Sequence, residues 1–272
     1  MSPIGVFDSG YGGLTVLKEI VNVLPEYDYV YLGDNARSPY GTRSFEVVYQ
    51  FTLECVKKLF EMDCHLVILA CNTASAKALR TIQQKDLPCI DPDRRVLGVI
   101  RPTAEIIGNY SKTNCVGVLG TQGTVASLSY LMEIEKFFPN LNVYQEACPL
   151  WVPLIENNEY IGDGADYFVK KNVDHLISKG DDIDTILLGC THYPLLIDKI
   201  KKYAPPQVQI ISQGEIVAKS LKEYMNRHPE MDAKCTKNGQ RFFYTTDTAD
   251  IFDKHASEFF GQEVKSQHIA LH

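Results

Sequence analysis

Short apolar runs separated by longer amphipathic stretches form the dominant pattern along the chain. Several runs are rich in Val and Ile and lack the alternation of a half-exposed strand, which is typical of strands buried on both faces of a parallel sheet. The pattern predicts buried strands at residues 4–7, 29–32, 66–70, 96–99, 116–119, 186–188 and 208–211.

The stretches between these runs carry apolar residues at helical spacing. Ser44 is a suitable N-cap, and Pro102 and Pro194 stand where the first turn of a helix tolerates proline. Helices are predicted at residues 13–24, 44–62, 74–84, 102–109, 124–137, 162–179, 193–203 and 214–227. Because strands and helices alternate, we predict an α/β fold with mainly parallel sheets that helices cover on both faces.

The C-terminal part of the chain continues this pattern with a strand at 241–246, a helix at 248–260 and an extended segment at 264–271. We expect these residues to add at least one further strand to the edge of a sheet.

A weak internal repeat divides the chain into two related parts. Residues 67–73 resemble residues 186–192, since each segment is an apolar strand followed by a small residue, a cysteine and two polar residues. Residues 5–10 and 117–122 form a fainter pair. The repeat predicts two pseudo-symmetric α/β domains that face each other across a central cleft. Ligands of open α/β sheets bind beyond the carboxyl ends of the strands, so both cysteines are expected at that cleft.

Composition and charge narrow the class of protein. The 272 residues fit two domains or one large α/β domain, and the formal net charge is −7. Nucleic-acid surfaces need clustered Lys and Arg, so this balance argues against a nucleic-acid partner. No apolar run approaches the ~20 residues of a membrane span. The first residues lack the basic region of a signal peptide, so we expect a cytoplasmic protein.

Eight cysteines occur without a Cys-x-x-Cys pair, which favours free thiols in a reducing compartment. Cys71 and Cys190 each end a predicted strand and precede a predicted helix, where the helix dipole and free N–H groups favour a thiolate. We predict that both are catalytic. The remaining cysteines are interpreted as small buried apolar residues: Cys55, Cys64, Cys89, Cys115, Cys148 and Cys235.

Two thiols on opposite sides of a substrate suit a particular reaction. One removes a proton from a carbon, the other delivers a proton to the opposite face, and the stereocentre inverts. An ordinary thiol has a pKa of about 8.5, so a neighbouring group must tune each one. Asp8, at the end of the first strand, and His192, two residues after Cys190, are the candidates. Glu159, in a polar loop, is a candidate to orient His192.

Two loops are further candidates for substrate binding. The glycine-containing loop at 8–13 is predicted to bind a carboxylate through its N–H groups, and it lacks the spacing of known nucleotide loops. The loop at 33–41 is predicted to cap the substrate with Tyr40 facing the cleft. Zinc held by Cys71, Cys190 and His192 is an alternative, but no short-spaced ligand pair supports it, so we predict no metal.

At these positions the sequence resembles the glutamate racemases of the cofactor-independent aspartate/glutamate racemase superfamily. The motifs stand in family order from residue 5 to about residue 200. They are Asp8-Ser9-Gly10-x-Gly12-Gly13, the loop at 33–41, Ala70-Cys71-Asn72-Thr73-Ala74, Gly98-Val99-Ile100 with Pro102, and Gly189-Cys190-Thr191-His192-Tyr193-Pro194.

The resemblance implies that Cys71 and Cys190 exchange the Cα proton, with Asp8 assisting Cys71 and His192 assisting Cys190. It also implies a reaction without pyridoxal phosphate or another cofactor. The residues implied to hold the amino acid are Asp8, Ser9, Tyr40, Gly41, Asn72, Thr73, Thr191 and His192.

The architecture implied by the resemblance has a discontinuous first domain, residues 1–98 plus 209–272, and a second domain, residues 99–208. The resemblance further implies a homodimer and a supply of D-glutamate for bacterial peptidoglycan.

Two alternatives remain open. One is a racemase of the same superfamily that acts on aspartate or another amino acid, although aspartate racemases lack the Asp-Ser-Gly-x-Gly-Gly loop and the Cys-Thr-His-Tyr-Pro form present here. The other is a noncatalytic amino-acid-binding protein, which would need no second thiol.

Overall fold

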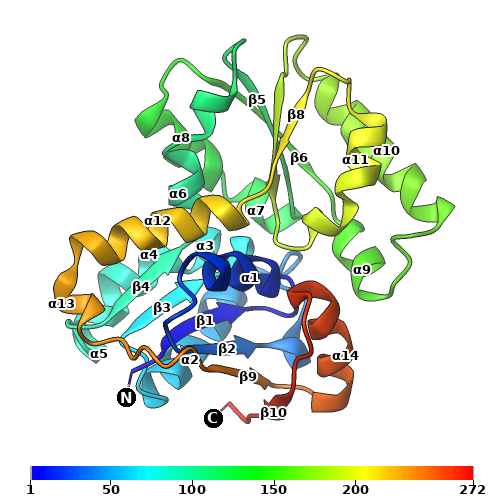
Figure 1. Cartoon of the computed structure of the whole chain (residues 1–272). Coiled ribbons are helices and arrows are strands. Elements are labelled where there is room, and N and C mark those ends of the chain that lie inside the picture. Colours follow the sequence, from blue (N-terminus) through cyan, green and yellow to red (C-terminus); the bar gives the residue numbers. More distant parts are fainter. Residues whose placement is uncertain (1, 272) are drawn as a thin grey trace.

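Two parallel sheets form the frame of the protein. The computed structural model describes residues 2–271, and every strand pair in both sheets is parallel. The strand order is β10-β9-β2-β1-β3-β4 in the first sheet and β6-β5-β7-β8 in the second. Figure 1 shows the two sheets in separate lobes. The predicted α/β fold with two parallel-sheet halves is therefore confirmed.

The strands match the predicted apolar runs, with one addition. They are β1 (Ile4–Asp8), β2 (Tyr29–Gly33), β3 (Leu66–Leu69), β4 (Arg95–Gly98), β5 (Cys115–Gly120), β6 (Asn142–Ala147), β7 (Thr185–Gly189), β8 (Gln209–Ile211), β9 (Arg241–Thr245) and β10 (Ser266–His268). Strand β6 was not predicted, because it lies at the edge of the second sheet and carries polar residues.

Helices connect the strands, and several predicted helices are divided into shorter ones. The helices are α1 (Gly13–Val23), α2 (Phe45–Glu61), α3 (Asn72–Lys77), α4 (Leu79–Thr81), α5 (Leu87–Ile90), α6 (Ile100–Ala104), α7 (Gln122–Ala126), α8 (Ser129–Phe137), α9 (Trp151–Glu156), α10 (Asp163–Ile177), α11 (Ile197–Tyr203), α12 (Gly214–Arg227), α13 (Pro229–Asp232) and α14 (Ala249–Phe260). The remaining helical segments are the 3₁₀ helices η1 (Asn35–Arg37), η3 (Ile107–Tyr110) and η4 (Tyr193–Leu196) and the π-helix η2 (Ile82–Asp86). Among the described residues, no helix has the length and apolar character of a membrane span.

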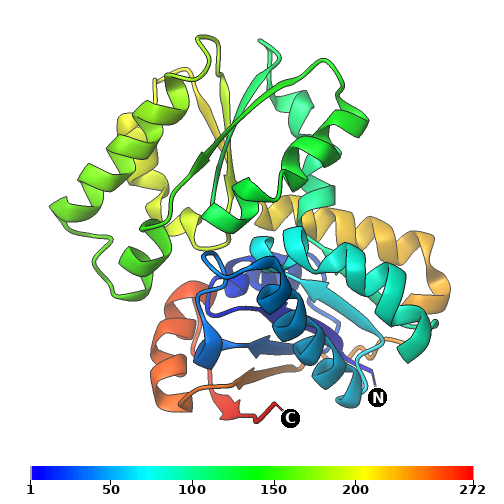
Figure 2. The same cartoon turned by 180° about the vertical axis from the view of Figure 1, so that it is seen from behind.

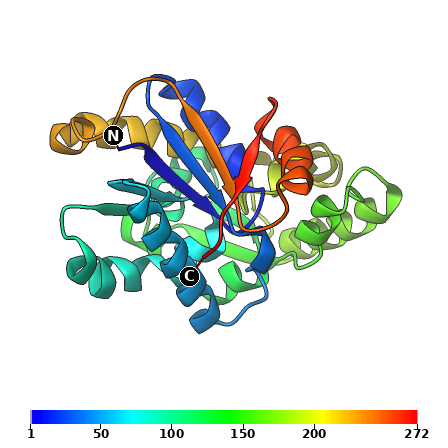
Figure 3. The same ribbon diagram turned by 90° about the horizontal axis from the view of Figure 1, so that it is seen from below.

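Alternate residues of the first sheet pack on opposite faces, as the two-residue period of a strand requires. Ile4 and Val6 of β1 belong to the core that also includes residues of α1, α12 and α14. Phe7 of the same strand belongs to the core that includes α2. Figure 3 shows helices on both sides of this sheet. Burial on both faces explains why these strands are continuous apolar runs in the sequence.

The two halves repeat the same topology. The order β2-β1-β3-β4 in the first sheet corresponds to β6-β5-β7-β8 in the second, so β3 and β7 occupy equivalent central positions. Cys71 follows β3 and Cys190 follows β7. The weak repeat in the sequence therefore has a structural counterpart, and it places the two cysteines at equivalent strand ends.

The chain passes between the halves twice, after β4 and after β8, and α12 lies at the boundary of the lobes (Figures 1 and 2). The domain division expected at 98/99 and 208/209 stays a prediction. However, residues 209–211 form β8, which pairs with β7, so a division by sheet membership falls after Ile211.

Candidate active site

A small cavity between the halves brings the predicted site residues together. The predicted residues that line it are Ser9, Tyr40, Gly41, Cys71, Asn72, Thr73, Cys190, Thr191 and His192. The volume open to the centre of a water-sized sphere is about 60 Å³, so the cavity is several times larger than the minimum needed for one water.

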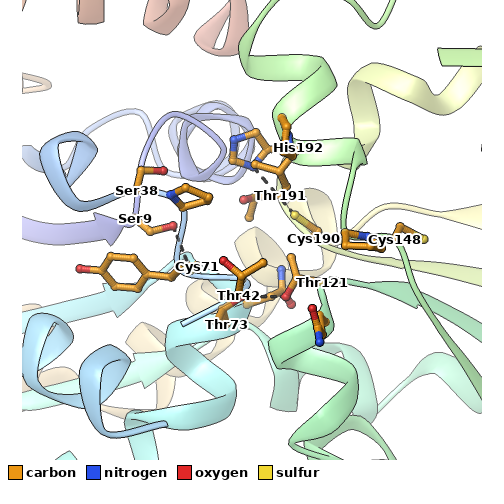
Figure 4. A pocket seen from close by; sticks show the side chains of 18 residues that line it. Ser9, Ser38, Thr42, Cys71, Thr73, Thr121, Cys148, Cys190, Thr191 and His192 are labelled. Atoms are coloured by element: carbon orange, nitrogen blue, oxygen red, sulfur yellow. Dashed lines mark hydrogen bonds between the residues drawn. The ribbon is translucent and has the colours of Figure 1, made fainter. Parts of the chain in front are cut away.

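Cys71 is held at the N-terminus of α3. Its Sγ accepts a hydrogen bond from the Ala74 N–H at 3.4 Å and lies 3.4 Å from Ser9 Oγ (Figure 4). Burial and the negative charge of Asp8 raise the pKa of Cys71 to about 12, against the lowering effect of Ser9 and the Ala74 N–H. The helix N-terminus was expected to favour the thiolate, but burial outweighs it. Cys71 is therefore a neutral thiol at neutral pH.

Asp8 lies behind the cavity rather than in its wall. Its side chain is 1% exposed, and it is absent from the described residues that line the cavity. One carboxylate oxygen accepts the Gly10 N–H at 2.9 Å, and the other is buried without a hydrogen-bond partner. Burial raises the pKa of Asp8, although the positive charge of His192 and backbone N–H groups oppose this. The expected assistance to Cys71 is thus electrostatic, and it favours the protonated thiol.

Cys190 lies beside an imidazole that is itself bound to a carboxylate. His192 Nδ1 is 3.9 Å from Cys190 Sγ, and His192 Nε2 is 3.0 Å from Glu156 Oε1. Burial alone would lower the pKa of His192, but hydrogen bonds to Cys190 and Glu156 raise it well above its usual value. The two hydrogen bonds favour the protonated imidazole, in which one N–H is directed at Glu156 and the other toward the sulfur. Its positive charge stabilises negative charge on Cys190.

The carboxylate beside His192 is Glu156, and the sequence-based choice of Glu159 is wrong. Glu156 ends α9, whereas the Glu159 side chain is exposed beyond the turn that follows. Trp151, Val152 and Ile155 of α9 are buried. Their spacing is the signal that could have revealed this helix and the direction of its last residue.

Replacing Glu156 with glutamine is expected to lower the pKa of His192 and to reduce kcat/KM about tenfold or more. In the folded wild type the pKa of His192 is raised above the ordinary value of about 6.5 that it has in the unfolded chain. Protonation of His192 therefore contributes fully to the free energy of unfolding below about pH 6.5, and this contribution is lost as the pH rises through the raised pKa. The measurements are an NMR titration of the His192 ring and stability against pH. Glu159→Gln is the matched control, because its side chain is exposed. If the two variants had the same His192 pKa and the same stability against pH, Glu156 would not be the partner of His192.

Tyr40 and Gly41 line the cavity in a different way from the one predicted. The Tyr40 hydroxyl donates its hydrogen to Asp34, so that hydrogen is not available to a substrate carboxylate, and the residue lines the cavity. Gly41 meets the other half directly, because its carbonyl accepts the Gly123 N–H at 2.8 Å. A Cβ at Gly41 would lie 3.0 Å from Thr121. The loop at 33–41 therefore closes on the second half, as its predicted capping role requires.

Further cavity residues were not predicted. They are Ser38, Pro39, Thr42, Thr121, Gln122, Cys148, Pro149, Val152 and Pro153. Thr121 is the counterpart of Ser9 in the internal repeat, which was an available signal, and its Oγ1 lies 2.9 Å from Thr73 Oγ1 across the cleft. Cys148 follows the unpredicted strand β6.

The remaining cysteines are mostly buried, as interpreted, with one correction. Cys89 is exposed, so its interpretation as a buried residue is wrong. Cys148 is buried but lines the cavity. All eight thiols are free, and residues 2–271 contain no group of three or more His, Cys, Asp or Glu side chains placed to hold a metal ion. The zinc alternative therefore lacks a ligand set in the described part of the chain.

The two parallel-sheet halves enclose a cavity with Cys71 from one half and Cys190 from the equivalent strand end of the other, an arrangement that suits proton transfer from two sides. Comparison with known proteins gives the family. Residues 4–221 match the Asp/Glu/hydantoin racemase family. The chain is 40% identical to a glutamate racemase of Persephonella marina over 269 residues, which are 98% of this chain and 97% of that protein. The chain belongs to the Asp/Glu/hydantoin racemase family.

Solved structures agree with this assignment. The crystal structure of a glutamate racemase isoform from Bacillus anthracis has a TM-score of 0.89 and 35% sequence identity, and the match covers 99% of this chain and 98% of that one. A glutamate racemase from Francisella tularensis, in complex with D-glutamate, has a TM-score of 0.87 and 33% identity with the same coverage.

Proposed function

We propose that this racemase interconverts L-glutamate and D-glutamate by moving the Cα proton between Cys71 and Cys190. The observation that carries the proposal is that these two thiols come from equivalent strand ends of opposite halves and line one cavity. The choice of glutamate is supported by the relatives, since those with about 40% identity over the whole chain bear that name.

The cavity offers polar groups that suit an amino acid with two carboxylates. Ser9, Thr73, Thr121 and Thr191 bring hydroxyl groups to its wall. The Asn72 side chain is 2% exposed, and its Nδ2 is buried without a hydrogen-bond partner. A buried N–H group without a partner is costly, so a bound carboxylate at Asn72 would satisfy it.

The two thiols have different charged neighbours: Asp8 acts on Cys71, whereas His192 lies beside Cys190. Burial and Asp8 keep Cys71 protonated, so Cys71 is ready to donate a proton. Cys190 then acts as the base that accepts the Cα proton, with the His192 ring 3.9 Å from its sulfur. In the reverse reaction the two thiols exchange roles, because the product leaves Cys190 protonated and Cys71 as the thiolate.

Deprotonation at Cα is the difficult step, since this proton is very weakly acidic. A shift of one pKa unit in a thiol corresponds to about 1.4 kcal/mol, which is small beside the barrier reductions that enzymes achieve. Fixed N–H and O–H donors around the cavity must therefore stabilise the charge that develops on the substrate carboxylate. Closure of the halves provides this by excluding water.

Incubation of the purified protein with L-glutamate, without any added cofactor, tests the proposal. We expect the optical rotation to decay to zero, since the two enantiomers have equal free energy in water. L-aspartate is the control, and it is expected to keep its rotation. Decay with aspartate and none with glutamate would replace the substrate assignment by the alternative racemase, and decay with neither would contradict a racemase.

Three finer statements belong to the same proposal. We propose that the D-glutamate is used for peptidoglycan, that the protein is a homodimer and that it resides in the cytoplasm. Sedimentation equilibrium tests the dimer. Dependence of a deletion strain on added D-glutamate tests the supply of the cell wall.

A further inference from the structure

Asn72 has a side-chain amide of which one end is satisfied by protein and the other is not. Its Oδ1 accepts a hydrogen bond from the Tyr130 hydroxyl at 2.7 Å, whereas its buried Nδ2 has no partner. Asn72 follows Cys71 directly and lines the cavity. The orientation of this amide therefore decides whether the cavity presents an N–H donor or a carbonyl acceptor at this point.

The partner of Asn72 is itself held by a residue near the crossing between the halves. Tyr130, on α8, is fully buried, and its hydroxyl accepts a hydrogen bond from Gln213 Nε2 at 2.6 Å. Gln213 immediately precedes α12 and is 4% exposed. The three buried side chains thus form one continuous path from the second crossing of the chain to the cavity.

The groups around Gln213 determine which partner donates in each hydrogen bond between Gln213, Tyr130 and Asn72. Gln213 Nε2 lies 3.2 Å from the Val99 carbonyl oxygen and 3.1 Å from Thr103 Oγ1. The Thr103 hydroxyl donates its hydrogen to the same Val99 carbonyl at 3.2 Å, so both groups near Gln213 act as acceptors. Reversing the Gln213 amide would place its oxygen against two acceptors. Gln213 therefore donates, and the single Tyr130 hydrogen is left for Asn72.

The path also joins the two halves of the protein. Asn72 begins α3 in the first half, whereas Tyr130 belongs to α8 in the second. Any separation of the halves would break the hydrogen bond between Asn72 and Tyr130. The amide of Asn72 is thus oriented when the halves are closed.

We propose that Gln213 and Tyr130 are positioning residues that hold the Asn72 amide with its N–H groups directed at a substrate carboxylate, and that they do so in the closed arrangement of the halves. The identity of the carboxylate rests on the proposed function, since it belongs to glutamate. Gln213 and Tyr130 touch no substrate in this account, and they act through Asn72.

Tyr130→Phe tests the proposal, because it removes the hydroxyl and retains the ring. With the donor lost, the Asn72 amide is free to rotate, and we expect the Kd for D-glutamate by calorimetry to rise about tenfold or more. We expect KM to rise by a similar factor and kcat to change less. The control is Tyr29→Phe, which removes a buried hydroxyl that donates to the Leu24 carbonyl oxygen at 2.7 Å near the start of β2. The two variants should lose similar thermal stability.

A double-mutant cycle separates positioning from a general structural effect. In the Asn72→Ala background, Tyr130→Phe is expected to have no further effect on the Kd, because the amide that it orients is gone. Additive effects in the double variant would overturn the proposal, and so would a Tyr130→Phe variant that binds as Tyr29→Phe does.

Gln213→Glu serves if Tyr130→Phe fails to fold. An ionised carboxylate only accepts hydrogen bonds, so it draws the Tyr130 hydrogen away from Asn72, and the same loss of affinity is expected. An unchanged affinity of Gln213→Glu for D-glutamate would contradict the positioning role of Gln213 and Tyr130. A wild type that binds glutamate without racemising it would contradict the proposed function alone, since the comparison of Kd values still tests the positioning residues. A wild type that does not bind glutamate would contradict both.

Discussion

Replacing Cys71 or Cys190 with alanine is expected to lower kcat/KM for glutamate by about 10²–10⁴-fold, the range that a positioned acid or base contributes. Each variant lacks the group that removes or delivers the proton on one face of Cα. The loss should be equal from L-glutamate and from D-glutamate, because the enantiomers have equal free energy in water and share one transition state. Initial rates from both directions measure this.

Cys115→Ala is the matched control for the two alanine variants. Cys115 is also buried, but it begins β5 and therefore lies at the opposite end of the strand from the cavity. We expect it to retain wild-type rates. If the Cys71 and Cys190 variants bound glutamate and racemised it at the rate of the control, the two-thiol mechanism would be contradicted.

Gly12→Ala is expected to reduce kcat/KM by about 10²-fold without direct removal of any reacting group. A Cβ at Gly12 would lie 2.3 Å from Thr191 Oγ1 and 2.4 Å from His192 Nδ1, the ring atom that faces Cys190. Both distances are too short for real atoms, so Thr191 and His192 must move. The steady-state rate and the ring titration of His192 report this displacement.

Gly164→Ala provides the comparison for the glycine substitution. Gly164 lies in α10, and a Cβ there would meet nothing within 4 Å. Alanine favours a helix over glycine by roughly 0.5–1 kcal/mol, so this variant should be slightly more stable and fully active. Wild-type activity in Gly12→Ala would show that the packing of Gly12 against His192 has no influence on the reaction.

The central strands and their cysteines could be predicted because local pattern and tertiary environment agree there. Residues of β1, β3, β5 and β7 are buried on both faces of a sheet, and such burial produces the apolar runs visible in the sequence. A strand end followed by a helix brings the next side chain to the same edge of the sheet. The positions of Cys71 and Cys190 follow from this rule.

Strand β6 could not be recognised by the same rule. It is an edge strand with polar and partly exposed residues, so its sequence lacks an apolar run. Because β6 was not predicted, the place of Cys148 in the cavity wall directly after this strand was not predicted either. Contacts between distant segments, such as those of Asn72 with Tyr130 and of His192 with Glu156, also leave no periodic trace in the sequence.

The electrostatic contrast between the thiols depends on burial, which the sequence does not specify. The position of Cys71 at a helix N-terminus indicated a thiolate, whereas burial and Asp8 raise its pKa. The neighbour of His192 was misassigned because two acids lie three residues apart in one polar segment. Only the end of α9 at Glu156 determines which of them reaches the ring.

The fate of the Cα proton in D₂O tests the central claim most directly. L-glutamate is incubated with the protein, and product and remaining substrate are separated at low conversion and examined by NMR. Transfer between two thiols predicts that D-glutamate carries deuterium at Cα from the first turnovers, whereas the remaining L-glutamate keeps its proton. If early D-glutamate retained the substrate proton, a single group would serve both faces, and the two-thiol account would be contradicted.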